Sequence, residues 1–74
     1  MARVFDFDGH PWSDNGLQGF RLRDPVDDLT SADVLRLTDG ATRALSYWKA
    51  EKIERTAKGW RGVLSQTEYD GGQR

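Results

Sequence analysis

The 74-residue chain contains no cysteine and only one histidine, His10. Without cysteine it can form neither a disulfide nor a thiolate metal site, and a single histidine cannot build a histidine metal cluster. Long apolar runs are missing as well: no segment approaches the roughly 20 residues that span a bilayer, and no charged-then-apolar leader opens the chain. We therefore expect a cytoplasmic protein without a metal, another cofactor or membrane contact.

Apolar side chains are also scarce, at 36% of the residues against 31% that are charged. A chain of this length buries only about 60% of the surface that its unfolded form exposes. The sequence therefore has room for one thin core and one site, in a single domain. Its three tryptophans matter for that core, because each can bury on the order of 150–250 Å².

Charges of the two signs are separated along the chain. Residues 1–42 carry eight aspartates and four arginines, whereas residues 43–61 carry six cations and two glutamates. The net charge of the whole chain is −1, but the local field steers a polyanion more than the total charge does. The separation predicts one basic face. The alternative is an ordinary solvated surface, since charged runs on helices usually face water.

The first 28 residues indicate a β-hairpin extension. In residues 3–8, RVFDFD, apolar and acidic side chains alternate with the period of a half-buried strand. Residues 9–16 are rich in turn formers and end in Asn15-Gly16, a strong turn dipeptide. Residues 17–23 then form a second strand, so the two strands would pack as a hairpin against the rest of the chain.

No constellation of catalytic residues stands out. Val4–Gly9, VFDFDG, resembles the first motif of haloacid-dehalogenase-type phosphatases, where the first aspartate is a nucleophile and the second a general acid. The match covers six residues, and that fold needs a doubly wound sheet larger than 74 residues can build. We therefore expect a binding protein and no enzyme.

A first short helix is predicted after residue 29. Thr30 is a good N-cap, and Asp33 follows three residues later in a position resembling a capping box. Ala32 and Leu35 would form the inward stripe, with Val34 as a possible further member. Gly40 would end this unit, because glycine can take the positive φ of a tight turn.

A second helix is predicted from about residue 41 or 42 to Glu51. Ala41, Leu45 and Trp48 recur at i, i+4 and i+7, so they would face the core. The outward face then holds Arg43, Ser46, Lys49 and Ala50. We expect this face to contact a DNA groove.

Residues 54–63, ERTAKGWRGV, indicate a two-strand turn with Lys58-Gly59 at its tip. Such a hairpin would be a wing that presents its cations to a phosphate backbone. Trp60 has two interpretations, as a core anchor of the wing or as an exposed aromatic against the backbone. Residues 64–74 predict a short helical turn at most, followed by a flexible tail.

Residues 30–63 resemble the winged helix-turn-helix of MerR-type regulators and of small excisionases from phages and mobile elements. The second-helix motif Leu-x-Tyr-Tyr/Trp is matched by residues 45–48, and the wing motif Arg-Thr-x-x-Gly-Tyr-Arg is matched across residues 55–61, with Trp60 in the tyrosine position. Ser46 replaces an arginine and Lys52 a glycine of the family pattern. No long dimerisation helix or effector domain follows, so the resemblance implies a minimal DNA binder.

The expected fold is therefore α+β: a small winged helix-turn-helix over residues 29–63, with two main helices and a β-hairpin wing, preceded by the N-terminal β-hairpin. The expected function is sequence-specific binding of double-stranded DNA, as a transcription regulator or excisionase, with an integrase or further copies on DNA as possible partners. Arg43 is the best candidate for base readout. The residues expected to bind DNA are Thr42, Arg43, Ser46, Tyr47, Lys49, Lys52, Arg55, Thr56, Lys58 and Arg61.

A second hypothesis is a small phage-type interaction or inhibitor protein. The acidic first half could imitate a phosphate backbone and dock on a basic host protein. A pI near 5.7 is also low for a lone DNA-binding module. The two hypotheses differ in one structural feature: DNA binding requires an open basic face, and is disfavoured if Asp24, Asp27 and Asp28 lie across it.

Overall fold

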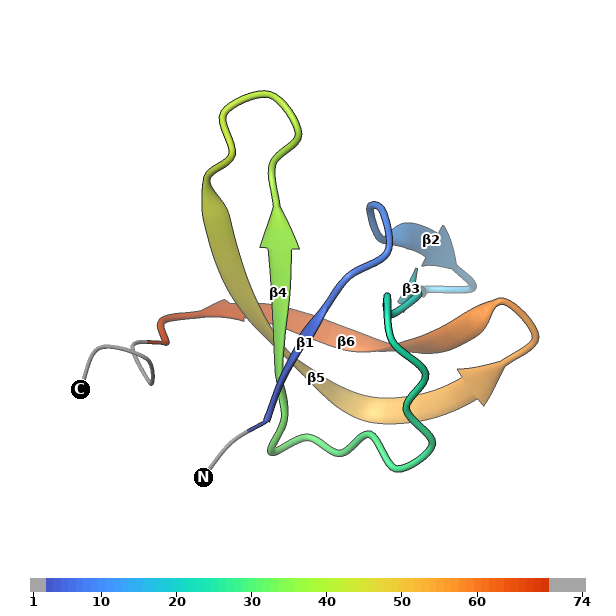
Figure 1. The fold of residues 1–74 in the computed structure, drawn as a ribbon. Coiled ribbons are helices and arrows are strands. Elements are labelled where there is room, and N and C mark those ends of the chain that lie inside the picture. Colours follow the sequence, from blue (N-terminus) through green and yellow to red (C-terminus); the bar gives the residue numbers. More distant parts are fainter. Residues whose placement is uncertain (1–2, 70–74) are drawn as a thin grey trace.

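The computed structural model describes residues 3–69, which form six β-strands and no helix (Figure 1). No part of this region is therefore a helix of the length and apolarity needed to cross a membrane. The strands are β1 (Val4–Asp6), β2 (Trp12–Asp14), β3 (Leu17–Phe20), β4 (Val34–Thr38), β5 (Leu45–Thr56) and β6 (Gly59–Thr67).

The strands form one mixed sheet in the order β1-β4-β5-β6-β3-β2. β1 pairs with β4 in parallel, with Val4 opposite Val34, and every other pairing between neighbouring strands is antiparallel. The long β5–β6 hairpin is the centre of the sheet, because it carries β4 on one side and β3 on the other. Most contacts in the whole structure join residues far apart in sequence.

A β-bulge bends β5 near its middle. The register with β6 shifts between Glu51 and Glu54, and Lys52 has a φ of 55°. A bulge adds an unpaired residue to one strand and increases its twist. The backbones come close there: a Cβ on Gly62 would lie 2.6 Å from the Glu51 carbonyl oxygen. Gly62 thus permits the bend that turns the sheet round on itself.

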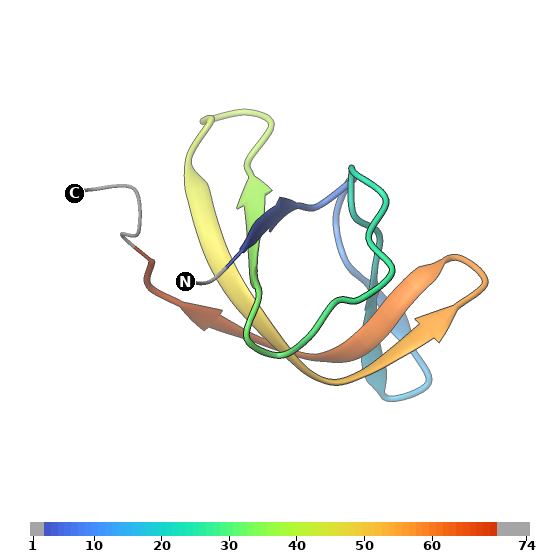
Figure 2. The same ribbon diagram turned by 60° about the horizontal axis from the view of Figure 1, so that its bottom comes forward.

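The bent sheet closes where the chain after β3 meets the free edge of β1. Phe7 and Leu22 form an antiparallel bridge. The Asp8 N–H donates to the Arg21 carbonyl oxygen at 2.6 Å, and the Arg23 N–H donates to that of Asp6 at 2.8 Å. Figure 2 shows the strands curving round the interior that results. This closure creates an enclosed interior in which a small chain can bury a hydrophobic core.

The core is a single cluster of side chains inside the curved sheet. Phe20 and Leu35 are its largest fully buried members, and the rings of Phe7 and Phe20 meet edge to face with centroids 5.7 Å apart. The buried members of the cluster come from four strands, β3, β4, β5 and β6, and from the segments between strands. Its buried members are Phe7, Phe20, Leu22, Leu29, Leu35, Ala50, Trp60 and Leu64.

The predicted winged helix-turn-helix is wrong, because both expected helices are strands. The local capping contacts at Thr30 are nevertheless present: its N–H donates to Asp33 Oδ2 at 2.9 Å, and its Oγ1 accepts the Ala32 N–H at 3.3 Å. The chain then enters β4 instead of a helix. Val34 and Leu35 are adjacent and both buried, as expected for a strand that is covered on both faces, because successive side chains of a strand point to opposite faces.

The second expected helix is the first half of β5. Leu45, expected in the core, is 50% exposed, whereas Ala50, expected outward, is 2% exposed. Trp48 and Ala50 lie two residues apart on the inner face, so the true period is two. A chain with so few apolar residues fits both periods over a short stretch, and pairing with β4 and β6 decides between them.

Other local predictions are confirmed. Asn15 and Gly16 have φ of 53° and 84° and form the turn between β2 and β3, although the expected partner of residues 17–23 was residues 3–8. The expected two-strand turn over residues 54–63 is the β5–β6 hairpin, and Trp60 is buried as a core anchor. β6 runs to Thr67 where at most a helical turn was expected; of the expected tail, residues 70–74 lie outside the described part.

Two leucine substitutions separate the sheet from the helical arrangement, in which both leucines would face the core. Leu35→Ala should cost about 2–5 kcal/mol in the free energy of unfolding, because it leaves a cavity. Leu45→Ala should change it by no more than about 0.5 kcal/mol, because this side chain is half exposed. Urea unfolding followed by tryptophan fluorescence measures both. Equal and large losses would contradict the sheet.

Candidate functional site

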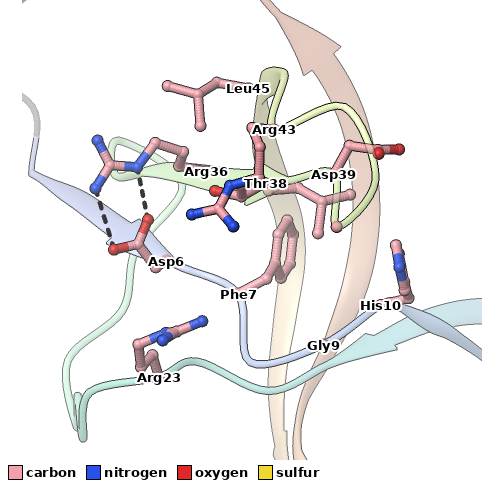
Figure 3. A pocket seen from close by; sticks show the side chains of 12 residues that line it. Asp6, Phe7, Gly9, His10, Arg23, Arg36, Thr38, Asp39, Arg43 and Leu45 are labelled. Atoms are coloured by element: carbon pink, nitrogen blue, oxygen red, sulfur yellow. Dashed lines mark hydrogen bonds and ion pairs between the residues drawn. The ribbon is translucent and has the colours of Figure 1, made fainter.

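A polar hollow of about 710 Å³ opens where β1 leaves β4. β1 pairs with β4 only as far as Arg36, so Leu37 and Thr38 continue along an edge that β1 does not cover. The turn between β4 and β5 forms one wall, and the chain after β1 forms the other. Three arginines from separate parts of the chain, Arg23, Arg36 and Arg43, line this space, which we call the arginine hollow (Figure 3).

Arg36 is held by Asp6. Its Nε donates to Asp6 Oδ1 at 2.6 Å, and its Nη2 donates to Oδ2 at 3.1 Å. This two-pronged contact lowers the pKa of Asp6 below its ordinary value, and the nearby charge of Arg23 acts in the same direction. The same hydrogen bonds raise the pKa of Arg36. The positive charge of Arg36 is thus largely offset at the hollow.

Arg43 is carried by a well-defined turn. Asp39 Oδ1 accepts the N–H groups of Ala41 and Thr42, both at 2.8 Å, and these bonds lower the pKa of Asp39. The Arg43 N–H donates to the Asp39 carbonyl oxygen at 2.9 Å, and Arg43 itself has a φ of 64°. The guanidinium group points into the hollow (Figure 3). The carboxylate of Asp39 serves the turn and not this arginine.

Arg23 and Arg43 differ from the other arginines around them. Within residues 3–69, neither guanidinium group makes an ion pair or a hydrogen bond. Both line the hollow, and the exposed His10 stands on the far wall. Two guanidinium groups without a direct ion pair in the described residues, facing one open space, can attract an anion, and each can offer a planar pair of donors to a phosphate or carboxylate.

Of the ten residues expected to bind DNA, only Arg43 lines this hollow. Thr42 is beside it on the β4–β5 turn, Lys58 is in the β5–β6 turn and Arg61 is on β6. The remaining six are spread along β5. They are Ser46, Tyr47, Lys49, Lys52, Arg55 and Thr56. The structure therefore distributes the expected site over the length of the central hairpin.

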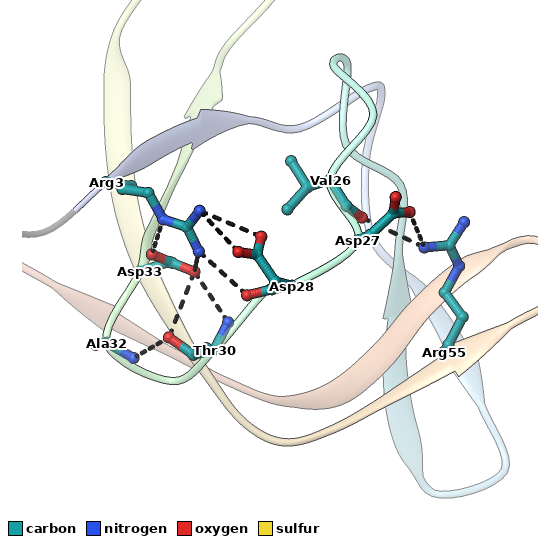
Figure 4. A network of polar contacts seen from close by, with 8 residues as sticks. All are labelled: Arg3, Val26, Asp27, Asp28, Thr30, Ala32, Asp33 and Arg55. Atoms are coloured by element: carbon teal, nitrogen blue, oxygen red, sulfur yellow. Dashed lines mark hydrogen bonds and ion pairs between the residues drawn. The ribbon is translucent and has the colours of Figure 1, made fainter.

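The cations of the expected wing are already engaged. Arg55 reaches Asp27 at 3.7 Å and the Val26 carbonyl oxygen at 3.3 Å (Figure 4), and it stacks over the Trp60 ring. Arg61 pairs with Glu54 at 2.7 Å and also approaches Asp14. The acidic segment before β4 thus lies across part of the expected basic face, which was the arrangement that disfavours DNA binding there.

The other members of the wing hairpin and of the first half of β5 also lack a common surface. Lys58 lies over the Trp12 ring, and Thr56 accepts the Gly59 N–H through its hydroxyl. Ser46 accepts a hydrogen bond from Trp48 on the inner face. Tyr47, which stacks on Tyr69, is on the opposite face with Lys49, because successive residues of a strand alternate. Lys52 is exposed at the bulge.

Sequence reasoning missed Arg23 and Arg36, which come from the predominantly acidic half of the chain. No spacing along the sequence joins them to Arg43. Only the pairing of β1 with β4 and the closure of the sheet bring these three arginines to one hollow. In residues 3–69, no group of three or more metal-ligating side chains comes together.

The Asp6–Arg36 pair should make stability depend on pH. Because the pKa of Asp6 is lower in the folded than in the unfolded chain, the pair stabilises the fold above the unfolded pKa of about 3.9. This contribution is lost as the pH falls through the folded value. Asp6→Asn should remove this part of the loss of stability on acidification, and the double variant should match it. Arg36→Gln should only reduce this loss, because Arg23 still lowers the pKa of Asp6 in that variant. Urea unfolding between pH 7 and pH 3 measures this, and an unchanged pH profile in Asp6→Asn would exclude the pair as its source.

Comparison of the chain with protein-family models, with curated proteins and with solved structures found no match. The resemblance to MerR-type domains stays a prediction at the level of the quoted residues, and the fold that it implied is wrong. What the described residues offer is two guanidinium groups that face the hollow and make no ion pair within residues 3–69.

Proposed function

We propose that this protein binds DNA and that it does so by holding backbone phosphate in the arginine hollow. The observation that carries the proposal is the pair of guanidinium groups, Arg23 and Arg43, that face one open space with no carboxylate partner in the described region. The proposed activity is binding and not catalysis. A cytoplasmic location stays a prediction from the sequence.

Phosphate suits this hollow better than a neutral ligand. The space is open and polar, so it would bury little apolar surface, and its walls offer fixed cations. Arginine presents parallel N–H groups that match two phosphate oxygens, and it stays charged at every physiological pH. Neutralising phosphates also releases counterions, which favours binding of a polyanion over a single small anion.

The proposal differs from the one that the sequence suggested. The regulator and excisionase roles predicted from the sequence relied on a helix in the major groove, and the described residues contain no helix, so these roles are not part of the proposal. Phosphate contacts position a protein but do not read sequence. Any selectivity would come from side chains beside the hollow, of which exposed Thr42 adjoins Arg43 on the same turn. An integrase or further copies as partners on DNA stay predictions.

The test is a fluorescence anisotropy titration of labelled double-stranded DNA at several salt concentrations. Log affinity should fall linearly with log salt, and Arg23→Ala and Arg43→Gly should each weaken binding and reduce that slope by about 1. Glycine is chosen at residue 43 because it adopts the positive φ freely. Arg61→Gln is the control, since it removes an equal charge from a cation that is already paired.

Asp6→Asn adds a complementary outcome. The substitution frees Arg36 and raises the net charge of the hollow by one, so DNA affinity should increase and the salt slope should steepen. If Arg61→Gln weakened binding more than Arg43→Gly, the contact surface would be the β5–β6 hairpin and not the hollow. Absence of binding even at low salt would overturn the proposal.

A protein partner is the second candidate function. Asp27 and Asp28 (Figure 4) have side chains exposed to 101% and 77%. Asp24 in the same loop is also exposed. This acidic segment could dock on a basic partner, as the second hypothesis from the sequence requires. If DNA does not bind, capture of a partner that is lost with Asp27→Asn plus Asp28→Asn would support it.

A further inference from the structure

β6 has a strand on both sides for only part of its length. β5 accompanies it as far as Thr67, whereas β3 pairs with it only across Trp60, Arg61 and Gly62. From Val63 to Thr67 the second edge of β6 pairs with no strand in the described part of the chain. Figure 1 shows this red portion of β6 running away from β3. We call residues 63–67 the open edge.

The open edge lacks the features that usually keep strand edges apart. Its sequence, VLSQT, has no charge, no proline and no glycine, and its register with β5 is unbroken from Val63 to Thr67. Natural edge strands are commonly protected by lysine, proline, bulges or short length. The other free edge, β2, shows such protection, since it has three residues and includes Asp14.

We propose that the open edge pairs with the same edge of a second copy of this chain, in antiparallel orientation. A two-fold axis at Ser65 would place Val63 of each copy opposite Thr67 of the other. All five residues are then paired, and the outward backbone groups of both edges find partners. The β5–β6 hairpins of the two copies would form one continuous sheet. This proposal does not depend on the proposed function.

A second copy fits this edge better than an unrelated strand. The segment is uncharged, so two identical segments meet without opposing like charges. An antiparallel pair about a two-fold axis is self-complementary and closes at two copies, so it does not continue into a fibre. Val63, 40% exposed on the outer face, would gain a neighbour across the interface. Five paired residues make a small contact, so the dimer should form reversibly with concentration.

The test is sedimentation equilibrium of the full chain, without DNA, over a wide concentration range. The wild-type mass should rise from 8.4 kDa towards twice that value. Ser65→Glu and Ser65→Lys each place like charges opposite one another at the axis, so each should raise the dissociation constant about tenfold or more. An equimolar mixture of the two variants should restore the dimer, because opposite charges then meet.

Ser65 is exposed and lies opposite Lys49 on β5. Ser65→Glu should therefore retain the wild-type unfolding midpoint, whereas Ser65→Lys adds a like charge opposite Lys49 and should lower the midpoint slightly. A wild-type chain that stays monomeric at every concentration would overturn the proposal and leave the edge to another protein. Variants that dimerise as the wild type does would place the contact elsewhere. Failure of the mixture to recover the dimer would show that charge at the axis is not what separates the copies.

Discussion

The bend in β5 is the constraint on which the rest of the structure depends. A straight β5–β6 hairpin would be a flat two-stranded ribbon that encloses no core. The bulge after Glu51 turns it, and Gly62 supplies the space that the turn needs. The bend brings the β4 side of the sheet close to the β3 side. The two sides are then joined, because β1 pairs with β4 and Phe7, which follows β1, bridges Leu22, which follows β3. The enclosed core is small, but it is the only large apolar volume that this composition can fill.

Two arginine–aspartate pairs fix the least extensive pairing in the sheet, that of β1 with β4. The pair Arg3–Asp33 precedes the three paired positions, and the pair Asp6–Arg36 ends them. Burial alone would raise the pKa of Asp33, but hydrogen bonds from Arg3 and Thr30 outweigh it and lower the pKa. A slip of one residue would break both pairs, so the charges specify register as well as adding stability. Figure 4 shows how the first pair also holds the segment that leads into β4.

The same ion pairs decide which charges remain for function. A run of cations between residues 43 and 61 suggested a basic face, yet Arg55 and Arg61 meet acidic side chains from elsewhere in the chain. Arginines outside that run become neighbours of Arg43 instead. A candidate anion site therefore depends on which charges lack a partner in the folded chain, and this cannot be counted along a sequence. The open edge of β6 has a similar origin, since β3 is too short to cover it.

The sequence by itself determined the local features: the Asn15-Gly16 turn, the hairpin over residues 54–63 and the contacts between Thr30 and Asp33. Each depends on residues close together in the chain. The burial of Trp60 was one of two interpretations that the sequence left open, and the fold decided between them. The tertiary structure alone decided that residues 34–38 and 45–51 are strands, and which arginines share a hollow. Both stretches are short enough to fit helical and strand periods, and their partners lie far away in sequence, as β1 is 30 residues from β4. Strand pairing across such distances is a property of the closed sheet, and it overrides local helix signals because only the sheet buries Val34, Leu35 and Ala50 together.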